Sequence, residues 1–277
     1  MLRYALPPWC AEKRTEELVE YCTETGINEV MFFTMGAKNF MELETNEESR
    51  AYAEVLRPAV KRLRSAGIEI SINVLCTIGH GDLGRDLRWK FTFQFQVDAD
   101  GTESKACACP LDRAWREYVA ELYRAYASLR PRIIWVDDDF RLHNHGTVRW
   151  GCFCPLHLDA LSKRIGHSLS REELVKAVLS PDLQPSEERI AWLGLMGDTM
   201  IEASAIIERA VHEVSPETRL GLMTSSPEVH CVEGRRWHEL LKALCGPHDP
   251  VVRPTLGNYS EGDRREFLRG LALALHT

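Results

Sequence analysis

The chain has 277 residues, of which 44% are hydrophobic and 27% are charged, a composition typical of one large globular domain. Its net charge is −7 and no basic cluster stands out, which excludes nucleic acid as an expected partner. No apolar run approaches the roughly 20 residues that cross a membrane. The N-terminal segment MLRYALPPWC lacks the basic start and apolar core of a signal peptide. We therefore expect a cytoplasmic protein with no membrane partner.

Apolar strand patterns alternate along the chain with amphipathic helix patterns. Strands are expected at 3–6, 27–33, 68–75, 132–138 and 218–225, with a short sixth strand within 249–259. Helices are expected at 11–26, 46–67, 110–131, 170–180, 186–216 (as one helix or two), 235–244 and 261–277, and the region 154–215 should be mostly helical. Asp112 is the expected N-cap of the third helix, and Ser170 with Glu173 has the pattern of a capping box.

This alternation is typical of parallel strands joined by crossover helices, as in a TIM (β/α)8 barrel or a doubly wound sheet. No Gly-x-Gly-x-x-Gly follows a strand, which argues against a dinucleotide-binding fold. We count about six strand–helix units where a closed barrel needs eight. The prediction is an α/β protein in which residues 1–277 form a single barrel domain that is incomplete at its C-terminus. The alternative is that 76–109 and 139–218 hold two further strands.

Three consecutive aspartates, Asp137, Asp138 and Asp139, follow the fourth predicted strand. In (β/α)8 enzymes catalytic groups lie at the carboxyl ends of the strands. Side chains alternate along a strand, which predicts that Asp137 and Asp139 point one way and Asp138 the other. Crowded carboxylates raise one another's pKa, as a general acid near neutral pH requires. Alternatively, individual aspartates cap loops or pair with Arg141 or Arg149.

The nine cysteines, in a chain without an export signal, are expected to be reduced thiols, and four of them fall in two short clusters. Cys152, Cys154 and His157 have the spacing of zinc ligands. Cys109, which ends the long loop after the third strand, is the best fourth ligand, and Cys107 is a substitute. Four protein ligands leave no open position, so the pattern predicts a structural zinc that joins two loops. The alternatives are buried free thiols or a disulfide between the clusters.

The combination CPLDRAWREYVAELYRAY, IIWVDDDFR and GCFCPLHLDAL resembles glycoside hydrolase family 42, the β-galactosidase-type barrels of clan A. In that family the helix after the third strand starts with Cys-Pro, and Arg-x-Tyr follows soon after. Cys109, Pro110, Arg116 and Tyr118 match this pattern. The resemblance is strongest over residues 107–165 and weaker over the first three strands.

The same resemblance implies roles for the aspartates. The fourth strand of the family ends in Asp-Asn-Glu and an aromatic residue, and the Glu is the acid/base. The matching run here is Asp137, Asp138, Asp139 and Phe140, so Asp139 is the implied catalytic residue. Asp138 replaces the Asn that contacts the sugar 2-hydroxyl. The family's nucleophile is a Glu at the end of strand seven, which our strand count places beyond the chain end.

The resemblance further implies a zinc site and a carbohydrate substrate. The family binds zinc through Cys-x-Cys-x-x-Cys and the earlier Cys, and here His157 stands in place of the last Cys. The implied activity is hydrolysis of a small O-linked glycoside. The family often forms trimers, so a homo-oligomer is compatible with this reading. Candidate substrate-binding residues besides Asp137 and Asp138 are His80, Arg141, His143 and Asn144.

Two other functions fit the same aspartates. In a metal-dependent hydrolase, Asp137 and Asp139 would bind a catalytic ion together with His143 or His145. A non-catalytic carbohydrate-binding barrel would keep the pocket and lack the nucleophile. The zinc-ligand pattern and the Cys-Pro context favour the glycosidase.

Overall fold

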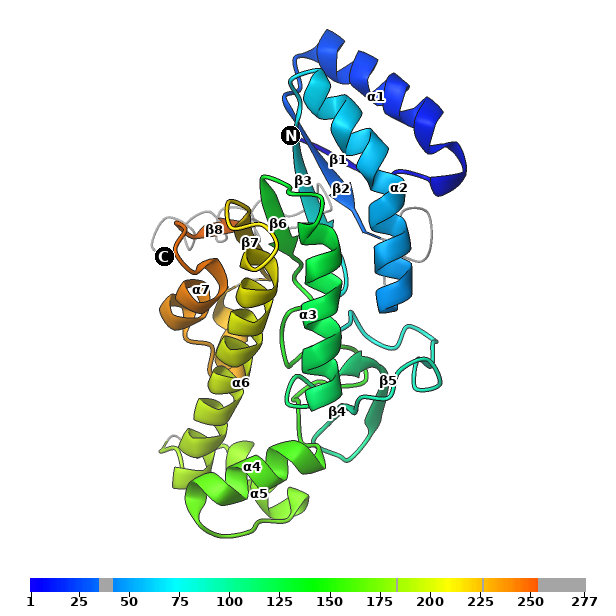
Figure 1. Cartoon of the computed structure of the whole chain (residues 1–277). Helices are drawn as coiled ribbons and strands as arrows, with labels where there is room; N and C mark the ends of the chain where they lie inside the picture. Colours follow the sequence, from blue (N-terminus) through cyan, green and yellow to red (C-terminus); the bar gives the residue numbers. More distant parts are fainter. Residues whose placement is uncertain (35–41, 183, 226, 254–277) are drawn as a thin grey trace, which may run out of the picture.

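A parallel sheet of six strands forms the centre of the protein in a computed structural model, which describes residues 1–34, 42–182, 184–225 and 227–253 (Figure 1). The strand order is β1-β2-β3-β6-β7-β8, and every neighbouring pair is parallel. The strands are β1 Leu2–Tyr4, β2 Glu29–Phe33, β3 Glu69–Val74, β6 Ile133–Val136, β7 Arg219–Met223 and β8 Val251–Arg253. All six predicted strands are therefore confirmed.

Helices connect these strands. They are α1 Ala11–Thr25, α2 Asn46–Ser65, α3 Arg113–Ala127, α4 Pro155–Ile165, α5 Arg171–Val178, α6 Glu187–His212 and α7 Trp237–Cys245, with short 3-10 turns at Pro8–Cys10 and Pro227–Glu233. The predicted segment 186–216 is thus one long helix. The helix predicted at 261–277 lies outside the described residues.

Local side-chain caps fix where several helices begin. Asp112 accepts hydrogen bonds from the backbone N–H groups of Ala114 and Trp115, as an N-cap should. The predicted capping box of Ser170 and Glu173 is present at the start of α5. These caps were predictable because each depends on residues only three positions apart.

The two faces of the sheet carry different kinds of packing. Outward side chains such as Val30, Ile72 and Leu222 join the main core with residues of α1, α2, α3, α6 and α7. The opposite face carries a small separate cluster, formed by Met31, Ile133, Trp135, Met223 and the partly buried Val251. Helices on one face are expected of a barrel, whereas a doubly wound sheet has helices on both. The described part of the chain is therefore an incomplete (β/α) barrel.

The long loop after β3 contains a hairpin that the sequence reading missed. Strands β4 Phe95–Val97 and β5 Glu103–Ala108 pair antiparallel, apart from the main sheet. They are not the missing barrel strands. Across the described part of 139–218 the structure has helices and a single isolated bridge between His143 and Trp150.

Helix α6 is long and apolar enough to cross a membrane by length and composition alone, with half of its most apolar window buried inside the molecule. It packs against α3 on one side and α7 on the other (Figure 1). Burial between two helices accounts for its apolar composition.

Gly221 of β7 provides a test of packing on the inner face. A Cβ atom at this position would lie 2.7–3.0 Å from three atoms of the Trp135 ring on the neighbouring strand. We expect Gly221→Ala to lower the free energy of unfolding by about 1–3 kcal/mol, because a well-packed ring must move. Urea unfolding measures this.

Gly194→Ala is the matched control, because its Cβ would meet only the tip of the flexible Arg164 side chain. In helix α6 this substitution should be neutral or stabilising by up to about 1 kcal/mol. Equal losses of stability in the two variants would contradict the packing account.

Candidate functional site

The three aspartates lie where β6 ends, beside the carboxyl end of β3, and their side chains differ in exposure. Asp137 is 6% exposed and Asp139 is fully buried. The Asp138 side chain is 30% exposed. This edge of a parallel sheet is where (β/α) enzymes place their catalytic groups.

Asp139 anchors the loop that follows β3. Its Oδ2 accepts hydrogen bonds from the backbone N–H groups of Thr77, Ile78 and Gly79, at 2.7, 2.8 and 2.7 Å. Its Oδ1 is buried and has no hydrogen-bond partner among the described residues. Gly79 has a φ of 125°, and a Cβ there would lie 2.5 Å from the carbonyl oxygen of Ala106, so only glycine fits.

Burial raises the pKa of Asp139 to about 6, although the nearby His80 and the backbone donors act to lower it. The charge of Asp137 raises it further. A carboxyl group with this pKa changes its charge near neutral pH.

Asp137 is held in place by two donors. The Asn73 side-chain amide donates to Oδ2 at 2.8 Å, and the backbone N–H of Asp138 donates to Oδ1 at 2.7 Å. Burial raises the pKa of Asp137 above its ordinary value, and these hydrogen bonds oppose that effect. Asn73 lies on β3, so the contact ties two neighbouring strands together.

The predicted alternation of the three aspartates is wrong. Each of the three aspartates places an oxygen within 4.8 Å of a ring nitrogen of His80, so Asp138 does not point away from the other two. Asp139 Oδ2 also accepts from the loop 77–79. The cause is that regular strand geometry stops at Val136 and a turn follows, in which the Phe140 N–H donates to the Asp137 carbonyl. Period-two alternation applies only within a strand.

The other predicted substrate-binding residues divide into two groups. His80 lies at the aspartates, with its Nδ1 3.9 Å from Asp138 Oδ1. Arg141 is also near, but its buried guanidinium donates to the backbone carbonyls of Asp138, His143 and Asn144, which holds the loop together. Asn144 is exposed, with a φ of 54°.

His143 belongs to a buried charge network that the sequence reading missed. Glu233 is fully buried and accepts hydrogen bonds from the Leu142 backbone N–H at 2.6 Å and from His230 Nδ1 at 3.1 Å. The His143 Nδ1 lies 3.4 Å from the same carboxylate, and the Arg235 Nε lies 2.5 Å from it. Burial acts to raise the pKa of Glu233, but Arg235 and the two histidines hold it well below its usual range.

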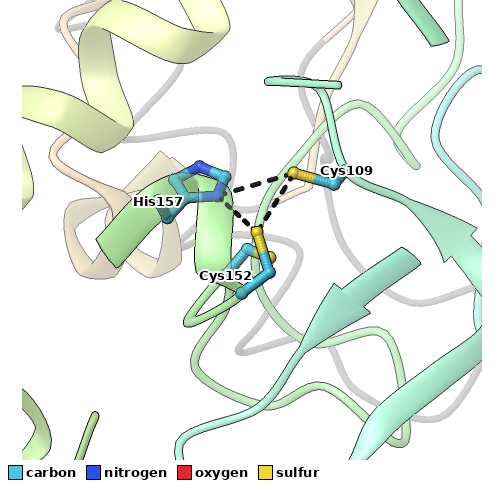
Figure 2. A group of neighbouring side chains, drawn as sticks. Cys109, Cys152 and His157 are labelled. Atoms are coloured by element: carbon cyan, nitrogen blue, oxygen red, sulfur yellow. Dashed lines mark hydrogen bonds between the residues drawn. The ribbon is translucent and has the colours of Figure 1, made fainter. Parts of the chain in front are cut away.

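The four predicted metal ligands come together in a second, fully buried cluster. Each ligand places a donor atom within 4.8 Å of the others, and the four are Cys109 directly after β5, Cys152, Cys154 and His157. Figure 2 shows Cys109, Cys152 and His157 converging. Cys107, the substitute ligand, lies elsewhere and points its Sγ at the Gly79 carbonyl.

The distances within this cluster suit a tetrahedral zinc ion. Cys109 Sγ lies 3.5 Å from Cys154 Sγ, and His157 Nδ1 lies 3.5 and 3.2 Å from these two sulfurs. Zinc–sulfur and zinc–nitrogen bonds at tetrahedral angles place sulfurs about 3.7 Å apart and a sulfur and nitrogen about 3.5 Å apart. The Val97 backbone N–H also donates to Cys152 Sγ at 3.3 Å, an arrangement that favours a thiolate.

All nine cysteines are free thiols in this structure, so a disulfide does not join the clusters. Burial raises the pKa of Cys109 and Cys152, while contacts from Cys109 and Cys152 lower that of Cys154. Cys154 is also the N-cap residue of α4, where the helix dipole favours a thiolate. The residues present therefore fit a zinc ion.

The one-sided parallel sheet, with carboxylates at the carboxyl end of its strands, defines the class of fold as a (β/α) barrel, present in part. No protein-family model and no curated protein sequence matches the chain. Solved structures give the particular fold. The β-galactosidase from Bacillus circulans sp. alkalophilus superimposes with a TM-score of 0.63 at 14% identity, covering 99% of this chain and 42% of that one.

Two further β-galactosidases have the same fold. The enzyme from the Antarctic haloarchaeon Halorubrum lacusprofundi gives a TM-score of 0.61 at 15% identity, over 96% of this chain and 43% of that one. Gan42B, a GH42 enzyme from G. stearothermophilus, gives 0.53 at 15% identity, over 82% and 35%. The fold is thus that of β-galactosidase barrels, among them the GH42 enzyme Gan42B, and the chain spans less than half the length of these enzymes.

Asp139 predicts a specific dependence of stability on pH. Its pKa is about 6 in the folded protein, against about 3.9 for a free aspartate. The folded state therefore binds this proton more tightly than the unfolded state. The resulting stabilisation is complete below about pH 4 and is lost as the pH rises through about 6, by at most about 3 kcal/mol.

Asp139→Asn should remove this contribution, so urea unfolding at several pH values from about 4 to about 7 should show a flatter pH profile than wild type. Asp86→Asn is the control. The exposed Asp86 pairs with Arg88, which lowers its pKa to about 2, so it titrates below this range. Parallel profiles for wild type and Asp139→Asn would show that Asp139 has no such role.

Proposed function

We propose that this chain forms the acid side of a glycoside hydrolase active site, acting on a small β-linked glycoside such as a β-galactoside. The observation that carries the proposal is the run of three aspartates at the carboxyl end of β6, in a sheet with the fold of β-galactosidases. Catalytic carboxylates of (β/α) glycosidases lie at this edge.

Within this proposal the aspartates have separate roles. Asp138 is the most exposed of the three and makes the direct contact with a sugar hydroxyl. Asp139 holds the position that the sequence resemblance gives to the acid/base, and its pKa of about 6 suits a general acid. Because its carboxyl group is buried, proton transfer to a glycosidic oxygen requires the loop at 77–79 to withdraw.

The second carboxylate comes from another part of the barrel. A retaining mechanism needs it about 5–5.5 Å from the acid, and an inverting mechanism needs a wider gap. The family resemblance assigns it to the seventh strand, which follows the six strands described here.

Galactoside binding tests the function. Titration calorimetry should show saturable binding of a β-galactoside to the wild-type chain, and Asp138→Asn should weaken it about tenfold or more, because a charged hydrogen-bond acceptor is lost. Asp159→Asn, on the exposed side of α4, is the control and should bind as wild type does. Failure of the wild-type chain to bind any galactoside would count against the proposal.

We further propose that Cys109, Cys152, Cys154 and His157 hold a structural zinc ion. The supporting observation is the near-tetrahedral spacing of four fully buried donors. Four protein ligands leave no position for a substrate, so the ion would add folding stability rather than chemistry. It would join the hairpin β4–β5 to the start of α4.

Cys109→Ser should abolish stoichiometric zinc, measured by elemental analysis, and should lower the melting temperature because the buried cluster loses its ion. Cys107→Ser is a close control, since Cys107 lies two residues before Cys109, on β5, and outside the cluster. Retention of one zinc per chain in Cys109→Ser would exclude Cys109 as a ligand.

A further inference from the structure

We propose that His80, Asp137 and Asp138 form a second metal site, which binds an oxygen-preferring divalent cation such as Mn²⁺. The three residues place one ligand atom each within 4.8 Å of the others. The site is separate from the cysteine cluster and goes beyond the proposed glycosidase, because cation binding here does not require sugar hydrolysis.

The hydrogen bonding of His80 prepares it for a metal. Its Nε2 lies 2.7 Å from the Leu75 carbonyl oxygen. A carbonyl oxygen can only accept a hydrogen bond, so Nε2 carries the hydrogen and donates it. Neutral imidazole then leaves a lone pair on Nδ1, the nitrogen that faces Asp138. Metal-binding histidines commonly donate their other N–H to a backbone carbonyl in this way.

The two carboxylates are oriented in complementary ways. Asp137 is buried, and its carboxylate accepts hydrogen bonds from the Asn73 amide and the Asp138 N–H. Hydrogen bonds of this kind orient the carboxylates that bind metals in proteins. Asp138 is partly exposed, so the side of the site that it forms faces solvent. An ion held by three protein ligands would keep open positions for water or for hydroxyl groups of a bound sugar.

An independent observation supports cation binding here. Asp139 is fully buried, its Oδ1 has no hydrogen-bond partner in the described structure, and one of its oxygens lies within 4.8 Å of a His80 ring nitrogen. Three carboxylates thus meet here. The one described guanidinium at ion-pair distance is that of Arg141, 3.9 Å from Asp138 Oδ1. A divalent ion would balance the remaining negative charge.

The residues also explain why the cation site is here and not at the neighbouring histidines. His143 and His145 were the ligands expected for a metal-dependent hydrolase. His143 lies against Glu233, which already pairs with Arg235, and His145 Nε2 is bonded to the Arg141 carbonyl. Carboxylate and imidazole donors together suit Mn²⁺ better than the thiolate-rich site does.

The test is Mn²⁺ binding measured by electron paramagnetic resonance. The protein is first loaded with zinc, so that the cysteine cluster is already filled. We expect one Mn²⁺ per chain and a ¹⁴N coupling from the His80 imidazole. Asp138→Asn should weaken binding at least about tenfold, since it removes a charged ligand. His80→Gln, which can still donate to the Leu75 carbonyl, should abolish the ¹⁴N coupling.

Asp86→Asn, an exposed aspartate in the same loop, is the matched control and should bind Mn²⁺ as wild type does. Absence of specific Mn²⁺ binding, or unchanged binding in both Asp138→Asn and His80→Gln, would overturn the site. The galactoside titration is read separately. Mn²⁺ binding without galactoside binding would contradict the proposed glycosidase and support the metal site. Galactoside binding without Mn²⁺ binding would support the glycosidase and contradict the metal site.

Discussion

The arrangement of the candidate site depends on one carboxylate oxygen that accepts three backbone N–H groups. Through Asp139, the turn after β6 holds residues 77–79 of the loop that leaves β3. This contact sets the position of residues 76–80, and with it the distance between His80 and the partly exposed Asp138. A charged acceptor forms stronger hydrogen bonds than a neutral one, and burial keeps water from competing. The same burial raises the pKa of the Asp139 carboxyl group.

The cysteine cluster also fixes the position of loops, at a place further from the sheet. Among the described residues, β4 and β5 pair with each other and with no other strand, and two short strands alone are marginally stable in water. Four buried donors from the hairpin end, the segment at 152–154 and helix α4 bring these parts together. Two loops with little regular structure are thereby positioned against a rigid sheet.

Local patterns predicted the six strands and the caps at Asp112 and Ser170, since each depends on neighbours in the chain. The spacing around Cys152 likewise predicted that Cys154 and His157 would lie beside it, and the place of Cys109 at the end of its loop made it the best fourth candidate. The hairpin β4–β5 was not predicted because its strands are short and their alternation of apolar and polar residues lies within a polar loop. The buried network around Glu233 was not predicted for a different reason. Its partner Leu142 is 91 residues away in sequence, and no local pattern distinguishes a buried glutamate from an exposed one.

Glu233 has a consequence for how this protein can diverge. The loop after β6 and the turn after β7 share one buried charge, supplied by Glu233 and balanced by Arg235 with help from His143 and the Leu142 backbone. Loops of (β/α) barrels are often regarded as exchangeable parts. Replacing the first loop alone would keep the Glu233–Arg235 pair but remove the donors of Leu142 and His143. The buried carboxylate would then lack hydrogen-bond donors, at a cost of about 1–3 kcal/mol. New specificities at this edge should therefore arise by changing both loops together.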